Sequence, residues 1–308
     1  MSFTVKILGT SSATFSNERN QSSQALKAKN SYYIIDCGEG TQIQLKKNSI
    51  KTQKIDAIFI SHLHGDHYLG LFGLLSTMSL NKREKPLSLY GPKGLKEIIT
   101  TQLQFSGSYF YYPVYFKEIK TTTSQVIHKD KNITVSAFPI QHGIECYGFR
   151  FDAPQVLRKL IIDKLPKNTP LSFFKPLKEG KDLTLESGEV IKSDDVTHPA
   201  PSAVSYAYCS DTSFAPQIVP FIKNVTTLYH EATFTEEFID RAISTNHSTA
   251  KQAAQIAKLA NASQLLVAHY SARYKDSQQH FKEASEVFKN VICLNDNDTI
   301  EIKNPTLP

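Results

Sequence analysis

The segment at residues 55–67, I-D-A-I-F-I-S-H-L-H-G-D-H, joins an apolar run to a group of metal-binding side chains. The apolar run Ile58-Phe59-Ile60 is typical of a buried strand. Directly after it come three histidines and one aspartate: His62, His64, Asp66 and His67. Imidazole nitrogens and carboxylate oxygens are ligands that suit Zn²⁺. The segment therefore predicts a metal site at the end of a strand.

The spacing of these four residues supports this interpretation. Alternate residues of an extended segment share a face, so His62, His64 and Asp66 can converge on one point. Gly65 permits the sharp turn that brings His67 to the same place. Single histidines are usually solvated loop residues or satisfied core residues, but four ligand-type residues at this spacing favour a metal site.

Further ligand-type residues follow other predicted strands. His142 follows a strand at 131–140, and later strands end at Asp211, at His230-Glu231 and at His269. Loops beyond strand ends converge in α/β sheets. The candidate ligands are five histidines and two aspartates: His62, His64, Asp66, His67, His142, Asp211 and His269. These exceed the ~4 ligands of one zinc ion and fit two ions that share a carboxylate, with Asp211 the natural bridge. Paired ions activate water and stabilise phosphoryl transition states.

Strands alternate with helices along most of the chain, which predicts an α/β fold. Asp36 ends a predicted strand at 31–36 and either binds metal or braces the histidine loop. The aromatic stretch at 109–116, Y-F-Y-Y-P-V-Y-F, is interpreted as a core or subunit contact in preference to a base-stacking surface. Residues 152–200 are rich in Pro, Lys and Asp and are interpreted as an insertion that projects from the main body.

The composition is that of a globular chain of 308 residues with 35 Lys and Arg against 29 Asp and Glu. This mild positive charge permits a polyanionic partner without demonstrating one. No stretch approaches the ~18 apolar residues that span a membrane, and the N-terminus lacks a signal-peptide pattern. The four cysteines are scattered, which favours free thiols. We therefore predict a cytoplasmic protein that does not bind membranes.

The motif H-L-H-G-D-H resembles the H-x-H-x-D-H signature of the metallo-β-lactamase superfamily. The wider set resembles the short-form tRNase Z family, the ribonucleases that trim the 3′ trailer from precursor tRNA. The supporting motifs occur in family order from residue 1 to about 275: S-H-L-H-G-D-H-Y-L-G-L-F-G-L-L-S-T-M, I-Q-H-G, S-D-T, H-E-A-T-F, N-H-S-T-A and H-Y-S-A-R-Y. H-E-A-T-F with H-S-T and S-A-R-Y is far more specific than H-x-H-x-D-H alone.

The resemblance implies a single domain over residues 1–308 with an αβ/βα four-layer sandwich fold, and a flexible arm for tRNA (an exosite) in the insertion at 152–200. It implies two Zn²⁺ per subunit and a homodimer acting on precursor tRNA. One ion is expected at His62, His64 and His142, and the other at Asp66, His67 and His269, with Asp211 between them.

The resemblance also implies roles in the reaction. Asp66 is expected to act as general base, and His247 of H-S-T to protonate the leaving 3′-oxygen, oriented by Glu231 of H-E-A-T. An imidazole has a suitable pKa for this task, although a helix-start or solvent position is the alternative for His247. The residues expected to contact RNA are Arg19, Asn20, Arg158, Lys159, Lys164, Lys167 and Arg273.

Two segments depart from the family pattern. The P-x-K-x-R-N loop reads F-S-N-E-R-N at residues 15–20, and the insertion lacks the glycine-proline core of the family's arm. The enzyme alternative is a metal-dependent phosphodiesterase or related hydrolase acting on a small substrate. A non-catalytic RNA-binding module is a different class, but all seven ligand residues are present.

Overall fold

The computed structural model describes residues 2–14, 18–200 and 202–303, which form two compact units. The larger unit contains residues 2–153 and the chain from 204 onward, and the smaller unit spans Pro154–Ala203. The smaller unit overlaps the insertion expected at 152–200. The single-domain assignment and the role of this insertion as an arm stay predictions.

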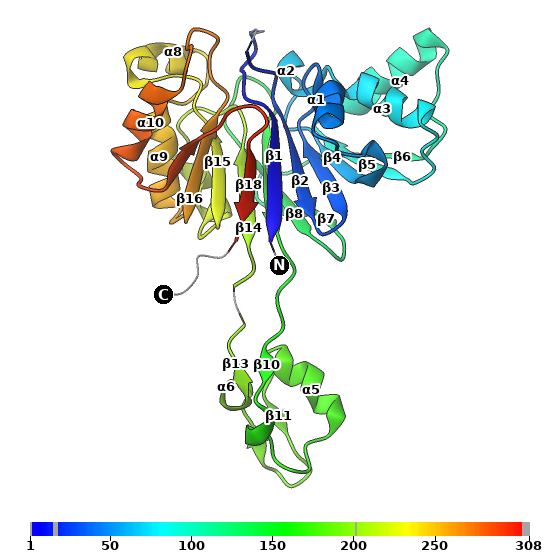
Figure 1. Ribbon diagram of the computed structural model, residues 1–308, viewed down its shortest axis with the longest axis vertical. Helices are drawn as coiled ribbons and strands as arrows, with labels where there is room; N and C mark the ends of the chain where they lie inside the picture. The colour runs from blue at the N-terminus through cyan, green and yellow to red at the C-terminus, as the bar shows by residue number, and fades with distance from the viewer. Residues whose placement is uncertain (1, 15–17, 201, 304–308) are drawn as a thin grey trace. The chain divides into compact units, whose positions relative to one another are not determined.

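The larger unit contains two seven-stranded sheets in the described part of the chain, with helices on their outer faces (Figure 1). The first sheet has the order β18 (Thr299–Ile302), β1 (Phe3–Gly9), β2 (Ser23–Ala28), β3 (Ser31–Ile35), β4 (Ile55–Phe59), β5 (Leu87–Gly91) and β6 (Val114–Glu118). The second has the order β17 (Val291–Cys293), β16 (Gln264–Ala268), β15 (Thr227–Glu231), β14 (Ser205–Cys209), β9 (Tyr147–Asp152), β8 (Thr134–Pro139) and β7 (Gln125–Lys129).

Helices join the parallel strands of each sheet. The run β3 to β6 is parallel, and so is β14 to β17. Parallel neighbours need a crossover, and helices supply it here. On the first sheet these are α1 (Thr41–Lys47), α2 (Gly65–Tyr68), α3 (Leu71–Leu80) and α4 (Leu95–Ser106). On the second they are α7 (Val219–Ile222), α8 (Ile239–Ser244), α9 (Ala250–Leu259) and α10 (Gln278–Ser285).

Apolar side chains fill the space between the two sheets and the space under the helices. Phe59 of β4 lies against Phe149 and Phe151 of β9, with ring centroids 5.6 Å away in both cases, so the inner faces form one core. On the outer face of the first sheet, Ile58 and Leu74 belong to a second core beneath the helices. Helix, sheet, sheet and helix thus make four layers, as expected from the sequence.

Helix α9 illustrates how local sequence sets an element boundary. Thr249 caps it: its side chain accepts a hydrogen bond from the backbone of Gln252, whose side chain bonds back to the Thr249 backbone. This reciprocal capping box satisfies two amides that the helix leaves unpaired. The helix then lays its buried alanines, among them Ala253 and Ala257, on the second sheet.

The smaller unit has its own core. Its elements are β10 (Lys159–Leu160), α5 (Leu171–Lys178), β11 (Leu183–Thr184), β12 (Val190–Ile191), α6 (Ser193–Val196) and β13 (Thr197–His198). Leu177, Ile191 and Val196 are buried together. In the described ranges all four cysteines are free. No helix within those ranges has the length and apolar character needed to cross a bilayer.

Candidate active site

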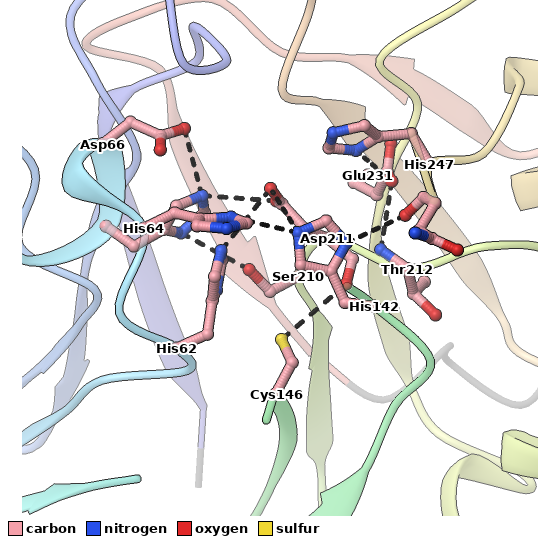
Figure 2. A network of polar contacts seen from close by, with 12 residues as sticks. His62, His64, Asp66, His142, Cys146, Ser210, Asp211, Thr212, Glu231 and His247 are labelled. Carbon is pink, nitrogen blue, oxygen red and sulfur yellow. Dashed lines mark hydrogen bonds and ion pairs between the residues drawn. The ribbon is translucent and has the colours of Figure 1, made fainter. Parts of the chain in front are cut away.

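The seven predicted ligands converge beyond the ends of the strands. Figure 2 labels His62, His64, Asp66, His142 and Asp211 among them. His62 and His64 lie on the loop after β4, and Asp66 and His67 lie in α2. The other three follow strands of the second sheet: His142 follows β8, Asp211 follows β14 and His269 follows β16. Both sheets therefore contribute to one site.

The first group of ligands consists of His62, His64, His142 and Asp211, whose ligand atoms all lie within 4.8 Å of one another. His64 turns its Nδ1 inward, 3.1 Å from Nε2 of His142. Asp211 Oδ2 lies 3.7 Å from Nε2 of His62 and 3.9 Å from Nε2 of His142. We call these four residues the first cluster.

The second cluster consists of Asp66, His67, His269 and again Asp211. Nε2 of His67 lies 3.2 Å from Asp66 Oδ2 and 3.3 Å from Asp211 Oδ1. Nε2 of His269 lies 3.4 Å from Asp66 Oδ2 and 3.1 Å from Asp211 Oδ1. Asp211 thus turns one carboxylate oxygen toward each cluster.

These spacings fit a bound cation. Ligands ~2.1 Å from a tetrahedral ion stand about 3.4 Å apart. Three buried atoms at the clusters, Nε2 of His62, Nε2 of His67 and Oδ1 of Asp211, have no hydrogen-bond partner in the described part of the chain. Buried polar atoms without partners are costly, and a metal ion would satisfy them. The residues therefore form a metal-binding site.

The electrostatics of the clusters favour ligation. Burial and the neighbouring His67 lower the pKa of His62, which keeps its imidazole neutral and able to bind metal. Burial raises the pKa of Asp66, but His67 and a hydrogen bond from His269 outweigh it and hold that pKa well below its usual range. Burial lowers the pKa of His67, yet the carboxylates around it raise that pKa well above normal. The clusters therefore hold negative charge that a cation can neutralise.

Asp36 braces the site from behind. Its Oδ2 lies 2.8 Å from Nδ1 of His67, 2.7 Å from the hydroxyl of Tyr208 and 2.9 Å from that of Ser61, and its Oδ1 accepts from the Ser61 amide. Its φ is +56°, an unusual conformation for a residue other than glycine. Of the two predicted roles, the geometry supports the bracing of the histidine loop. Asp36 contacts Nδ1 of His67, whose Nε2 faces the other ligands, and so orients this histidine.

His247 and Glu231 form an ion pair beside the clusters. Nδ1 of His247 lies 2.9 Å from Glu231 Oε1, and its ring centroid is 5.6 Å from that of His269. Burial opposes ionisation, but Glu231 raises the pKa of His247 to about 9. Burial likewise raises the pKa of Glu231, and the charge on His247 outweighs it and lowers that pKa. The pair is thus a protonated imidazole held by a carboxylate, suited to donate a proton.

The loop residues expected to contact RNA make internal contacts. Arg19 donates to the backbone carbonyls of Tyr274 and Lys275, at 2.9 and 3.4 Å, and stacks over Tyr270. Asn20 donates through its amide and side chain to Asp296 Oδ2, both at 2.6 Å. Residues 15–17 of this loop lie outside the described residues.

The remaining predicted RNA contacts differ in their surroundings. Arg273 is exposed and lies over Phe234 and Phe238, 5.0 and 4.4 Å from their ring centroids. Arg158 donates to Ser193 and pairs with Asp194. The other three are exposed and belong to the smaller unit: Lys159, Lys164 and Lys167.

Three residues that the sequence analysis did not assign hold the ligands in place. The Ser61 hydroxyl lies 2.9 Å from Nδ1 of His62, and the Thr233 hydroxyl lies 2.9 Å from Nδ1 of His269. The backbone carbonyl of Asn246 lies 2.9 Å from Nδ1 of His142. Their sequence signal was their place in the quoted motifs S-H-L-H-G-D-H, H-E-A-T-F and N-H-S-T-A.

Comparisons with known proteins show the fold and the family of this chain. A family model described as Anti-Pycsar protein Apyc1 matches residues 3–158. Ribonuclease Z of Cytophaga hutchinsonii is 45% identical over 94% of this chain and 93% of its own length. Ribonuclease Z of Bacteroides fragilis is 41% identical, over 97% and 99%. The crystal structure of human tRNase Z, short form, matches with a TM-score of 0.72 and 26% identity over 97% of this chain and 99% of its own.

The fold and the ligand set define a metal-binding hydrolase of the metallo-β-lactamase fold. The metallo-β-lactamase fold protein YhfI of Bacillus subtilis matches this fold with a TM-score of 0.69 and 18% identity, over 98% of this chain and 100% of its own. The full-length similarity is more specific, and the chain belongs to the ribonuclease Z family. The predicted family, fold class and enzyme class are confirmed.

Proposed function

We propose that this protein is a zinc-dependent endoribonuclease that removes the 3′ trailer from precursor tRNA. Membership of the ribonuclease Z family supports the predicted function of a tRNA 3′-processing endoribonuclease. The observation that carries the proposal is the His247–Glu231 pair beside two ligand clusters that share Asp211. A paired metal site alone would fit many hydrolases, whereas this pair adds an acid for a poor leaving group.

The two clusters would hold two zinc ions per subunit. The first cluster offers three imidazole nitrogens and the second two, and Asp211 gives one oxygen to each. Ions bound there lower the pKa of water and neutralise charge on a phosphodiester. Histidine-rich ligand sets suit zinc well.

Two side chains, Asp66 and His247, carry out the two proton transfers of the reaction. Asp66 is ionised and lies in the second cluster, so it can accept the proton of the attacking water. His247 is protonated and gives its proton to the leaving 3′-oxygen, while Glu231 fixes the imidazole through Nδ1 and leaves Nε2 as the donating atom. The cut falls after the discriminator base and leaves a 3′-hydroxyl on the tRNA and a 5′-phosphate on the trailer.

RNA contacts are proposed on both units. Lys159, Lys164 and Lys167 are exposed on the smaller unit, and we assign it the role of the arm, with salt-sensitive contacts to phosphates. Arg273 offers an exposed guanidinium stacked on aromatic rings, a good surface for RNA. Arg19, Asn20 and Arg158, which are engaged internally, would act mainly by shaping their loops.

A homodimer is proposed with its contact near α3 and α4. Four large side chains there are exposed by 64 to 85%: Leu80, Phe105, Tyr109 and Tyr111. Exposed apolar side chains that lie together mark interaction surfaces. Light scattering after gel filtration should give a dimer mass, and Leu80→Glu combined with Phe105→Glu should give the monomer mass. A cytoplasmic location and the absence of membrane binding stay predictions.

The function is tested by incubating the zinc-loaded protein with a 3′-extended precursor tRNA and mapping the new ends. One cut after the discriminator base is expected, and Asp66→Ala should abolish it. A protein that binds metal and hydrolyses a small phosphodiester, but leaves the precursor tRNA intact, would favour the alternative of a small-substrate phosphodiesterase. Deletion of residues 156–200 should weaken cleavage of the tRNA far more than hydrolysis of the small substrate.

A further inference from the structure

The hydroxyl of Thr233 lies among the ligand clusters and the acid pair. Its Oγ1 is 2.8 Å from Glu231 Oε2, 2.9 Å from Nδ1 of His269 and 3.1 Å from Nδ1 of His247. Thr233 is buried, with 3% of its surface exposed. One small group thus contacts a metal ligand, the carboxylate and the imidazole at once.

The donors and acceptors around this hydroxyl can be assigned. His269 turns Nε2 toward Asp66 and Asp211, so Nδ1 is the nitrogen that carries its proton when Nε2 binds metal. That Nδ1–H donates to Thr233 Oγ1, whose own proton goes to the carboxylate oxygen Oε2 of Glu231. The chain of bonds therefore runs from His269 through Thr233 to Glu231.

Both carboxylate oxygens of Glu231 are fully occupied by hydrogen-bond donors, so no further donor can compete with the Thr233 hydroxyl. Its Oε2 also accepts the amide of Thr233 at 2.8 Å. Its Oε1 accepts the amides of Thr212 and Ser248, at 3.1 and 3.0 Å, as well as His247 Nδ1. Every bond to this buried carboxylate comes from a fixed donor. The Thr233 hydroxyl is thus the side-chain donor to Oε2 and helps to hold the carboxylate that contacts His247.

The backbone around Thr233 makes this position rigid. The amide of Ala232 donates to the carbonyl of Ala268, and the amide of Ser271 donates to the carbonyl of Thr233, at 2.9 and 3.2 Å. His269 between them has a φ of +66°, a conformation that a residue other than glycine adopts only when its surroundings hold it. The hydroxyl and the imidazole are therefore held against each other by paired backbone.

We propose that Thr233 is a positioning residue that couples the second cluster to the proton donor: its hydroxyl fixes the Nδ1–H form of His269 and the carboxylate that orients His247. The expected effect of this coupling on RNA cleavage rests on the proposed function. The expected effect on metal binding is independent of it. Outer partners of ligating histidines typically change metal affinity or activity ~10–100-fold.

The test compares Thr233→Val, which keeps the shape but lacks the hydroxyl, with Thr233→Ser, which keeps the hydroxyl. Zinc affinity is measured by competition with a chelator, and cleavage of precursor tRNA is measured as kcat and KM. Thr233→Val should bind the zinc ion of the second cluster ~10–100-fold less tightly and lower kcat with little change in KM. Thr233→Ser should behave as the wild type in both measurements.

Thr235→Val is the matched control, because Thr235 is also buried and its hydroxyl bonds to Tyr274 and not to a metal ligand or His247. It should leave zinc affinity unchanged. The proposal is overturned if Thr233→Val has wild-type affinity and kcat, or if Thr233→Ser is as impaired as Thr233→Val. Should the wild type fail to cut tRNA, the proposed function fails while the zinc measurement still decides on Thr233.

A measurement on the wild-type protein removes any dependence on how the variants fold. Long-range ¹H–¹⁵N spectra of the zinc-loaded protein, with histidines labelled, report which nitrogen of His269 carries hydrogen. Hydrogen on Nδ1 is expected, with slow exchange because the site is buried. A bare Nδ1 would overturn the proposal, because the hydroxyl would then have no proton to accept from His269.

Discussion

Nδ1 of His142 lies 2.9 Å from the backbone carbonyl oxygen of Asn246, the residue directly before His247. With Nε2 of His142 turned toward His64 and Asp211, Nδ1 is the donor of this bond. The loop that carries His247 is thus attached to the first cluster through Asn246, as it is to the second through Thr233. Neither His247 nor its loop is independent of the ligands, so metal binding and proton donation should respond together to substitutions.

Replacement of His247 by alanine should affect substrates according to their leaving group. On precursor tRNA the leaving alkoxide needs a proton, so loss of the acid should lower kcat by ~100- to 10,000-fold. Bis(p-nitrophenyl) phosphate releases a stable phenolate that needs no proton, so its hydrolysis should change little. Steady-state kinetics on both substrates checks this. Equal losses on both would show that His247 supports the metal site and does not donate a proton.

The Glu231→Gln substitution should move the alkaline limb of the pH profile to lower pH. His247 can donate only while protonated, so kcat falls as the pH rises through its pKa. Glu231 raises that pKa to about 9 in the metal-free protein, and bound cations lower it in the loaded enzyme. Without the carboxylate the limb should move down by ~1–3 pH units. The kcat profile on precursor tRNA measures the shift, and an unchanged limb contradicts the assignment.

The ligand set was predictable because its members combine rare types with a fixed position. Histidine or aspartate follows an apolar strand at His62 of the first sheet and at His142, Asp211 and His269 of the second, and loops beyond strand ends converge. Thr233 and Ser61 have no such signature. Hydroxyls are common in loops, and their roles depend on distances of 2.9 Å that only the folded chain defines.

Other features were hard to predict because polar residues are buried or are bound inside the protein. β2, S-Q-A-L-K-A, was not predicted, because its buried Ser23 and Gln24 interrupt the apolar pattern. The carbonyls of Tyr274 and Lys275 bind the guanidinium of Arg19, whose contact with RNA stays a prediction. A guanidinium binds carbonyl oxygens and phosphates through the same donors, so composition does not distinguish the two.

The Asp36→Asn substitution should weaken zinc binding at the second cluster. The amide keeps the volume of the carboxylate but replaces one acceptor oxygen with a donor, which faces the donors of His67, Tyr208 and Ser61. Loss of an outer partner of this kind should cost ~10–100-fold in affinity. Chelator competition measures it. The control is Asp56→Asn, which breaks a surface ion pair with Lys85 and should leave zinc affinity unchanged. Wild-type zinc affinity in Asp36→Asn would refute the role of Asp36 in holding His67.

Gly70 should be required for the stability of the protein, whereas Gly73 should not. A Cβ on Gly70 would stand 2.0 Å from the carbonyl oxygen of Gly38, whereas a Cβ on Gly73 would meet only the side chain of Gln42, at 3.2 Å. The loop at 37–40 contacts the histidine loop closely, since the Cys37 amide donates to the His67 carbonyl at 2.7 Å. Gly70→Ala should therefore lower the free energy of unfolding by ~1–3 kcal/mol and also weaken zinc binding.

Gly73→Ala is the matched control for that substitution. It lies inside α3, where alanine stabilises a helix by up to ~1 kcal/mol relative to glycine, and the side chain of Gln42 can move aside. Chemical denaturation of both zinc-free variants separates the two cases. If Gly70→Ala is as stable as Gly73→Ala and binds zinc normally, the loop at 37–40 does not constrain the histidine loop, and the position of His67 depends instead on its contact with Asp36.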